Sequence, residues 1–335
     1  MKLSRRQFLT TAAAAATTAA TPSWAQSRPI KVRVAYLPVI PSDGHLWLAD
    51  HFGWWKEQGL DFEYVRFNTG PEQFQAMVGG SIDVLTAGAA LANFPARGQG
   101  KVFLAGFLER SSTQLWVNPK MGISSIADLK GRQVATTRGT TAEFMLDHAL
   151  ASAKLTAGKD VEVINQPMPG AVAGFITGAV PAVALWVPFD LEVRKRMPEA
   201  QKLTDAGSYF PASAVLDGWA AGNEYHQKNP DVLKRIIRGW IRANDYLVVN
   251  RAEAIALLHK NRYANLDRAT IDAMIDAITA YPTVEWKRLY EDGSVRRWLQ
   301  QTTDFFARAG NLKDVIPAER YFDGSLFLEV VSSLK

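Results

Sequence analysis

The chain has 335 residues, of which 47% are hydrophobic, 10% aromatic and 21% charged, and none is cysteine. This length is sufficient for two lobes, and the lack of cysteine excludes disulfides, thiolate metal ligands and thiol nucleophiles. The formal net charge of +5 falls to +2 when the three basic residues of the first 25 positions are set aside. The charge therefore gives no sign of a nucleic-acid partner.

The first 25 residues have the pattern of an export signal. Twin arginines occur in Ser4–Leu9 (SRRQFL), an Ala/Thr run covers Thr10–Ala20, and small residues precede a cleavage point at Ala25. This order is typical of secretory signals, and the apolar run is shorter than the roughly 20 residues of a membrane helix. We expect residues 1–25 to be a twin-arginine signal peptide and the mature chain, from Gln26, to work in the periplasm.

Strands and helices are expected to alternate through the first half of the mature chain. Branched apolar residues mark the strands, while N-cap residues, first-turn prolines and closing glycines mark the helices. The expected strands are Ile30–Tyr36, Leu60–Phe67, Ile82–Thr86, Gln133–Thr136, Val161–Asn165 and Val183–Trp186. The expected helices are Gly44–Gln58 with Ser42 or Asp43 as N-cap, the helix opened by Thr69–Glu72, Ala142–Ala153 and Ala171–Thr177. Such alternation favours parallel, doubly wound sheets.

The second half of the chain has a different spacing of apolar residues. From about Pro230 the apolar residues follow helical spacing, as in Val232–Ile241, and no strand is expected. Earlier in the chain, a glycine ends a helix and a buried strand follows at both Gly80–Val84 and Gly178–Ala182. The sequence therefore predicts an α/β fold with two similar doubly wound lobes, a cleft between them and a helical C-terminal cover.

Catalytic signatures are missing from the sequence. The chain has no G-x-S-x-G elbow, no phosphate-binding P-loop and no G-x-G-x-x-G fingerprint. The five histidines lack H-E-x-x-H spacing, and we interpret His51 and His148 as structural or surface residues. We expect a binding protein that is not an enzyme and that uses no cofactor or metal.

Four loops follow strands and precede helices. Ligands in open α/β sheets bind beyond the carboxyl ends of the strands, and helix N-termini offer free N–H groups that suit an anion. The four loops are Ser42–His45, Thr69–Pro71, Gly88–Leu91 and Gly139–Thr141. In the last, Thr140 and Glu143 have the spacing of a capping box, which leaves Thr141 and the backbone amides free for a ligand.

Two further segments place a carboxylate near tryptophan. They are Trp186–Asp190 and Leu216–Trp219. From the residues alone, each segment is interpreted as core and turn rather than as part of a pocket.

Several motifs resemble the sulfonate/nitrate/taurine substrate-binding proteins of ABC importers. Ala49–Leu60 is similar to the family pattern A-x-x-x-G-x-[FW]-x-x-x-G-L, and Gly79–Asp83 is similar to A-x-G-x-[IV]-D. Ile126–Ala135 resembles x-x-D-L-K-G-K-x-V-A, Trp186–Phe189 resembles W-x-P, and Glu224–Asp231 resembles x-x-F-x-x-x-N-P-E. The likeness extends from about Val32 to Trp240.

The resemblance implies a type II periplasmic-binding-protein fold whose lobes close on the ligand about a hinge. It implies lobes at 28–115 with 217–335 and at 116–216, and an anionic head held by the loops at Gly88 and Gly139. The segment around Asp217 is similar to the taurine-binding branch, in which the matching aspartate faces the ligand amine. The predicted ligand-binding residues are Pro38, Ser42, His45, Thr69, Gly70, Gly88, Ala89, Gly139, Thr140, Thr141, Trp186, Asp190 and Asp217.

Some positions depart from the family pattern. Pro181 stands where the family has aspartate, Arg110 beside Glu109 is a second candidate to contact an anion, and Tyr36–Val39 is more apolar than taurine would require. We predict a monomer that captures a taurine- or alkanesulfonate-like anion or zwitterion for an ABC importer permease. The alternatives are an exported sensor that presents a small aromatic or vitamin-precursor solute to a receptor, and an enzyme on the same fold.

Overall fold

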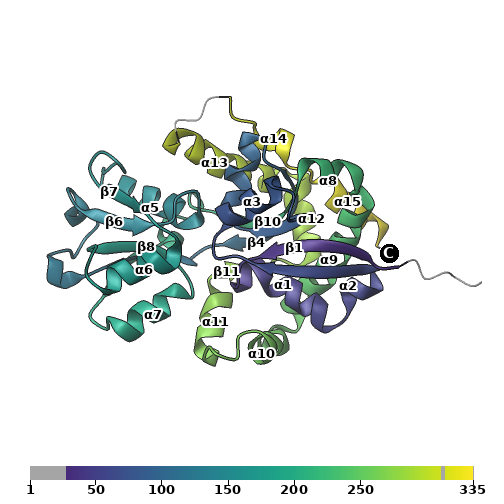
Figure 1. Ribbon diagram of the computed structural model, residues 1–335, viewed down its shortest axis with the longest axis horizontal. Helices are drawn as coiled ribbons and strands as arrows, with labels where there is room; N and C mark the ends of the chain where they lie inside the picture. Colours follow the sequence, from purple (N-terminus) through teal and green to yellow (C-terminus); the bar gives the residue numbers. More distant parts are fainter. Residues whose placement is uncertain (1–27, 311–313, 335) are drawn as a thin grey trace, which may run out of the picture.

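The computed structural model describes residues 28–310 and 314–334. The predicted signal peptide at 1–25 lies outside the described residues. Two lobes lie side by side, each built on one mixed sheet with helices on its faces (Figure 1).

The first lobe contains a six-stranded sheet in the order β11-β4-β10-β3-β1-β2. Strand β1 pairs in parallel with β2 and β3, whereas β10 runs antiparallel to β3 and β4. The strands are β1 (Ile30–Tyr36), β2 (Leu60–Arg66), β3 (Val84–Ala87), β4 (Lys101–Glu109), β10 (Val215–Ala221) and β11 (Ile278–Thr279). The strand β11 corrects the expectation that the C-terminal part has no strand.

The second lobe repeats this plan with a five-stranded sheet in the order β7-β6-β8-β5-β9. Strand β6 is parallel to β7 and β8, and β5 is antiparallel to β8 and β9. The strands are β5 (Thr113–Val117), β6 (Gln133–Thr136), β7 (Glu162–Asn165), β8 (Ala182–Trp186) and β9 (Gln201–Asp205). The chain therefore crosses between the lobes twice, at 110–112 and at 206–214, and the predicted boundaries fall inside β5 and β10.

The first helix of the first lobe begins earlier than the sequence suggested. Helix α1 (Ile40–His51) has Val39 as its N-cap and a proline in its first turn, so Ser42 and Asp43 lie inside the helix. A left-handed Gly53 then separates α1 from α2 (Trp54–Glu57), which corrects the single helix expected over Gly44–Gln58. Helices α3 (Gly70–Val78) and α4 (Ala90–Asn93) follow β2 and β3.

Three helices cover the second sheet. They are α5 (Thr141–Ser152), α6 (Met168–Ile176) and α7 (Phe189–Arg196), and the first two lie where helices were expected. Short 3-10 turns occur at η1 (Pro95–Arg97), η2 (Pro119–Met121), η3 (Ala127–Leu129) and η4 (Ala206–Tyr209).

The C-terminal helices cover the first lobe, as expected (Figure 1). The long helix α9 packs against α1 and α15, and its Trp240 is fully buried. These helices are α8 (Asn223–Lys228), α9 (Pro230–Val249), α10 (Arg251–Asn261), α11 (Arg268–Asp276), α12 (Thr283–Glu291), α13 (Ser294–Ala309), α14 (Ala318–Tyr321) and α15 (Ser325–Ser333). Helix α13 also contacts α5, so the cover reaches the second lobe.

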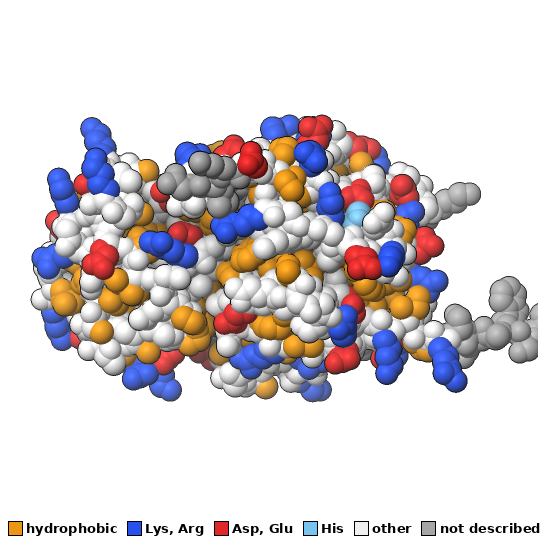
Figure 2. Space-filling view, turned by 45° about the horizontal axis from the view of Figure 1, so that its top comes forward, with side chains coloured by type: hydrophobic (Ala, Val, Ile, Leu, Met, Phe, Trp, Pro, Cys, Tyr) orange, Lys and Arg blue, Asp and Glu red, His pale blue; other side chains and the backbone are white. Residues whose placement is uncertain are grey.

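The surface carries charges of both signs, interspersed over the face that Figure 2 shows. None of the described helices is both long and apolar enough to cross a membrane.

Candidate ligand-binding site

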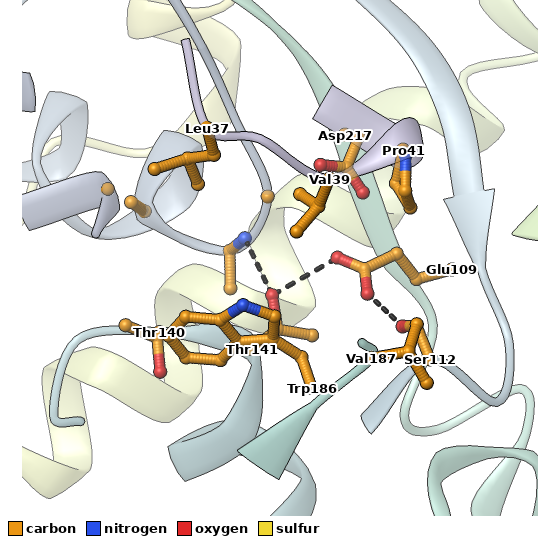
Figure 3. Close-up of a pocket in the computed structure, with 14 residues that line it drawn as sticks. Leu37, Val39, Pro41, Glu109, Ser112, Thr140, Thr141, Trp186, Val187 and Asp217 are labelled. Carbon is orange, nitrogen blue, oxygen red and sulfur yellow. Dashed lines mark hydrogen bonds between the residues drawn. The ribbon is translucent and has the colours of Figure 1, made fainter. Parts of the chain in front are cut away.

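A cavity lies where the two lobes meet, at the carboxyl ends of β1, β3, β6 and β8 (Figure 3). This edge is where open α/β sheets bind ligands. The cavity encloses about 50 Å³, which is room for a few water molecules or part of a compact solute. Its lining consists of Leu37, Val39, Pro41, Gly70, Gly88, Ala89, Ala90, Glu109, Ser112, Thr140, Thr141, Trp186, Val187 and Asp217.

Thr141 connects the two lobes across this cavity. Its hydroxyl accepts a hydrogen bond from the backbone N–H of Ala89 at 3.3 Å and donates one to Oε1 of Glu109 at 3.2 Å. Ser112, on the crossing segment between β4 and β5, donates to Oε2 of the same carboxylate. Figure 3 shows the Glu109 carboxylate between these two hydroxyls. One buried carboxylate therefore has contacts from the second lobe and from the crossing segment.

Asp217 supplies a second buried carboxylate. Glu109 of β4 is in register with Val215 of β10, so Asp217, two residues further along β10, lies on the same face of the sheet. Burial and the neighbouring Glu109 carboxylate both raise the pKa of Asp217 well above its ordinary value. Oδ2 of Asp217 has no hydrogen-bond partner among the described residues.

Gly88 allows these groups to approach one another. A Cβ at this position would lie 2.7 Å from Oε1 of Glu109, 2.8 Å from Oγ1 of Thr141 and 3.4 Å from Oδ1 of Asp217. The first two distances are shorter than van der Waals contact, so any side chain here would displace the polar groups of the cavity. The close approach of these polar groups therefore requires glycine at position 88.

Helix N-termini form the other polar part of the cavity. Helices α1, α3 and α5 begin at Ile40, Gly70 and Thr141, and each contributes a residue of its first turn to the lining. The first amides of a helix lack intrahelical acceptors and form its positive dipole end. The cavity therefore combines two carboxylates with donors that suit an anion.

The structure brings part of the predicted set together. The predicted residues that line the cavity are Gly70, Gly88, Ala89, Thr140, Thr141, Trp186 and Asp217. The predicted residues that do not line it are Pro38, Ser42, His45, Thr69, Gly139 and Asp190.

Most of the residues outside the cavity are engaged elsewhere. Ser42 bonds to the carbonyl and hydroxyl of Thr86 at 3.1 and 2.8 Å, because α1 starts at Ile40 and turns Ser42 inward. His45 is buried with its ring stacked on Phe107, and burial lowers its pKa to about 3.

Helix-end hydrogen bonds and an ion pair account for Thr69, Gly139 and Asp190. Thr69 and Glu72 form the capping box of α3, and Asp190 pairs with Arg194 at 3.1 Å. The capping box expected at Thr140 is wrong. Thr140 donates to the carbonyl of Thr137 at 2.6 Å, and Glu143 accepts from the amide of Gly139 at 2.7 Å.

Sequence reasoning missed Glu109 as a lining residue and considered its neighbour instead. Arg110 points away from the cavity, with its guanidinium 5.0 Å from the centroid of the Phe210 ring. The available signal was the position of Glu109 at the end of β4, a strand in which Val102 to Leu108 are all buried. A carboxylate that ends such a strand lies at a sheet edge with little access to water.

No group of three or more His, Asp or Glu side chains in the described ranges is arranged to hold a metal ion.

Comparison with known proteins finds similar sequences among solute-binding proteins. A protein of Brucella abortus (strain 2308) that carries the name "Putative binding protein" is 28% identical over 309 residues, which cover 91% of this chain and 94% of that protein. The taurine-binding periplasmic protein of Escherichia coli (strain K12) is 24% identical over 269 residues, 78% of this chain and 81% of that protein.

Solved structures share the fold. The alkanesulfonate-binding protein SsuA of Xanthomonas axonopodis pv. citri, bound to MOPS, matches with a TM-score of 0.71 at 20% identity, over 88% of this chain and 99% of that one. The desulfurization enzyme DSZB matches with a TM-score of 0.62 at 14% identity, over 91% and 99%. At these identities the likeness concerns the fold alone, and the predicted fold class is confirmed.

The family comparison agrees with the resemblance seen in the sequence motifs. The family profile described as "NMT1/THI5 like" matches residues 42–254, which is more than half of the chain. The chain belongs to the NMT1/THI5-like family.

Proposed function

We propose that this protein is the extracytoplasmic solute-binding component of an ABC importer and that it captures a small organic anion or zwitterion between its lobes. The observation that carries the proposal is the Thr141 bridge, in which one side chain of the second lobe bonds to Ala89 and Glu109 of the first beside the cavity. A cavity bridged by contacts between two lobes suits a protein whose lobes close on a ligand.

The lining suggests how a taurine-like ligand is held. The backbone N–H groups in the first turn of α5 and the N–H of Gly70 in α3 receive the acidic head. Trp186 and the aliphatic side chains of Leu37 and Val39 cover the carbon chain, while Glu109 and Asp217 take a cationic end.

Reversible binding accounts for the cavity better than catalysis. The titratable side chains of its lining are Glu109 and Asp217. Both belong to neighbouring strands and point to one side of the cavity, whereas general acid–base chemistry usually places its groups around the reacting bond. We further propose that the protein acts as a monomer in the periplasm and delivers its ligand to an importer permease.

A thermal-shift screen of the exported chain tests this function. The probes are taurine, alkanesulfonates, nitrate, aromatic acids and vitamin precursors. A ligand that binds only the folded state adds about 2.7 kcal/mol at a hundredfold excess over its Kd, so the unfolding midpoint should rise with one class. Unchanged midpoints with every class would contradict the proposed function.

A further inference from the structure

We propose that Glu109 and Asp217 form a single receptor for a cationic nitrogen, share one proton while the cavity is empty and release it when the ligand binds. The inference rests on the proposed binding function and narrows its ligand class. In this proposal the carboxylate pair selects amine-bearing zwitterions over plain anions, and Glu109 is a second specificity-determining residue.

The strand register places both carboxylates at one point. Glu109 and Asp217 are diagonal neighbours on one face of β4 and β10, and Oε1 of Glu109 and Oδ1 of Asp217 both lie near the Cβ position that Gly88 leaves open. The side chains are deeply buried, since the residues are only 6% and 3% exposed. Two carboxylates this close and this dry do not both ionise without a cation.

The rest of the site supplies no such cation. The lining of the cavity contains no lysine, arginine or histidine. Phe107 is the register partner of Asp217 and lies on the same face of the sheet. His45 of α1 stacks on the Phe107 ring and is neutral because burial lowers its pKa. Tyr290 of α12 bonds to the backbone of Ala105. Arg110, the nearest arginine in sequence, lies over Phe210 outside the cavity.

The hydrogen bonds of the two carboxylates show where a ligand fits. Each oxygen of Glu109 already accepts from a hydroxyl, of Thr141 or of Ser112, but Oδ2 of Asp217 is buried without a partner. An unpaired buried acceptor is costly. An ammonium or amidinium group would donate hydrogen bonds to Asp217 and to the second lone pairs of Glu109. Both carboxylates would then have hydrogen-bond donors.

The charge balance then requires proton release. The empty pair with one shared proton carries one negative charge, and the loaded pair carries two, opposite the positive nitrogen. The proton passes to solvent. Since the proton and the cation compete for the pair, affinity should rise with pH from about pH 4 and level off once the empty pair has lost its proton.

Matched ligands test the selection. Titration calorimetry would compare taurine with ethanesulfonate, and β-alanine with propanoate, so that only the amine differs within each pair. We expect the amine-bearing member to bind at least about 30-fold more tightly. Equal affinities within the pairs would overturn the inference while leaving the binding function intact, whereas a lack of any ligand in the broad screen would contradict the function itself.

Proton release gives a second, independent readout. Taurine titrations at pH 6 in buffers of different ionisation enthalpy should show a net release of protons on binding for the wild type. Glu109→Gln and Asp217→Asn should each reduce the proton count and the preference for the amine. Asp190→Asn, which changes a buried aspartate outside the cavity, should preserve both. Proton release that persists in Glu109→Gln would contradict the shared-proton pair.

Ligand-free protein provides a third readout. The pH dependence of the unfolding midpoint should become flatter in Asp217→Asn, because the shared proton stabilises only the folded state. An unchanged pH dependence in a variant that still folds would show that Asp217 holds no extra proton, and would overturn the inference without requiring any ligand.

Discussion

Thr141 of the second lobe donates a hydrogen bond to Glu109 of the first at 3.2 Å, and the same hydroxyl accepts from the amide of Ala89 at 3.3 Å. Two contacts between the lobes thus depend on one side-chain oxygen beside the cavity. A change at this atom should alter the closed state more than the stability of either lobe.

Thr141→Val keeps the shape of the side chain but removes its hydroxyl. The amide of Ala89 and one oxygen of Glu109 then lose their partner, which costs about 1–3 kcal/mol in the closed form. We expect ligand affinity to fall by roughly 10- to 100-fold, as measured by titration calorimetry. Thr141→Ser, which retains the oxygen, should bind nearly as well as the wild type, and a loss of affinity as large as that of the valine variant would argue against the bridge.

Gly88→Ala should abolish binding without unfolding the protein. The added Cβ would lie 2.7 Å from Oε1 of Glu109 and 2.8 Å from Oγ1 of Thr141, so these groups must move and the cavity loses its geometry. Gly170→Ala in α6 is a matched control, because its Cβ meets nothing closer than 3.6 Å and alanine favours a helix. Circular dichroism would report folding and calorimetry would report binding. Normal binding by Gly88→Ala would show that the site does not require glycine at this position.

The sequence predicts the two-lobed fold well because local patterns determine it. Alternation of strands with helices and the position of prolines and glycines indicated β1 to β3 and β6 to β8 near their observed bounds. The strands β4, β5, β9 and β10 join antiparallel partners far away in sequence. Such pairing leaves no local periodic signal, so the exact points of crossing between the lobes were not predictable.

Part of the site could also be predicted from local sequence, and part of it depends on contacts between segments far apart in the chain. The hydroxyl and glycine loops at Gly88 and Thr141 follow from the rule that ligands bind beyond the carboxyl ends of strands. The start of α1 was misplaced because Pro41, which precedes the predicted N-cap, lies in the first turn of the helix. Glu109 was missed as a lining residue because its nearness to Asp217 depends on the register of β4 and β10, which only the folded sheet defines.

Two buried groups on α1 should give opposite pH dependences of stability. Burial raises the pKa of Asp43 to about 7, despite its hydrogen bonds from Trp47 and Tyr263. The folded state therefore holds an extra proton, and this contribution to stability is lost as pH rises from about 4 to 7. Burial lowers the pKa of His45 to about 3, so its contribution is lost as pH falls below about 6.5. Between about pH 4 and 6.5 the two contributions cancel in part.

Asp43→Asn should leave the contribution of His45 to the pH dependence of stability without the opposing contribution of Asp43. We expect its free energy of unfolding to fall further between pH 7 and pH 4.5 than that of the wild type, by up to about 1.4 kcal/mol per pH unit. His45→Gln should show the reverse, with less loss on acidification. Comparing each variant with itself at two pH values removes any constant cost of the substitution. Parallel pH curves for both variants and the wild type would contradict these assignments.

The C-terminal cover contributes a second contact between the lobes, apart from the polar bridge. Phe305 of α13 packs against Phe144 of α5 with ring centroids 5.1 Å apart, and both side chains are buried with Phe306 and Val215. This apolar contact exists only while the second lobe lies against α13. Its burial should therefore favour the closed state in the absence of ligand.

Phe305→Leu should shift the protein towards an open form. The substitution reduces this contact by up to about 1.5 kcal/mol, which corresponds to roughly a tenfold change in the ratio of closed to open molecules. We expect a larger radius of gyration in X-ray scattering of the ligand-free protein and a weaker ligand affinity. Phe327→Leu is the control, because Phe327 is fully buried within the first lobe beside Tyr290 and Trp240. It should lower the unfolding midpoint without opening the lobes, and if the two variants changed scattering and affinity alike, Phe305 would act on the stability of the fold and not on closure.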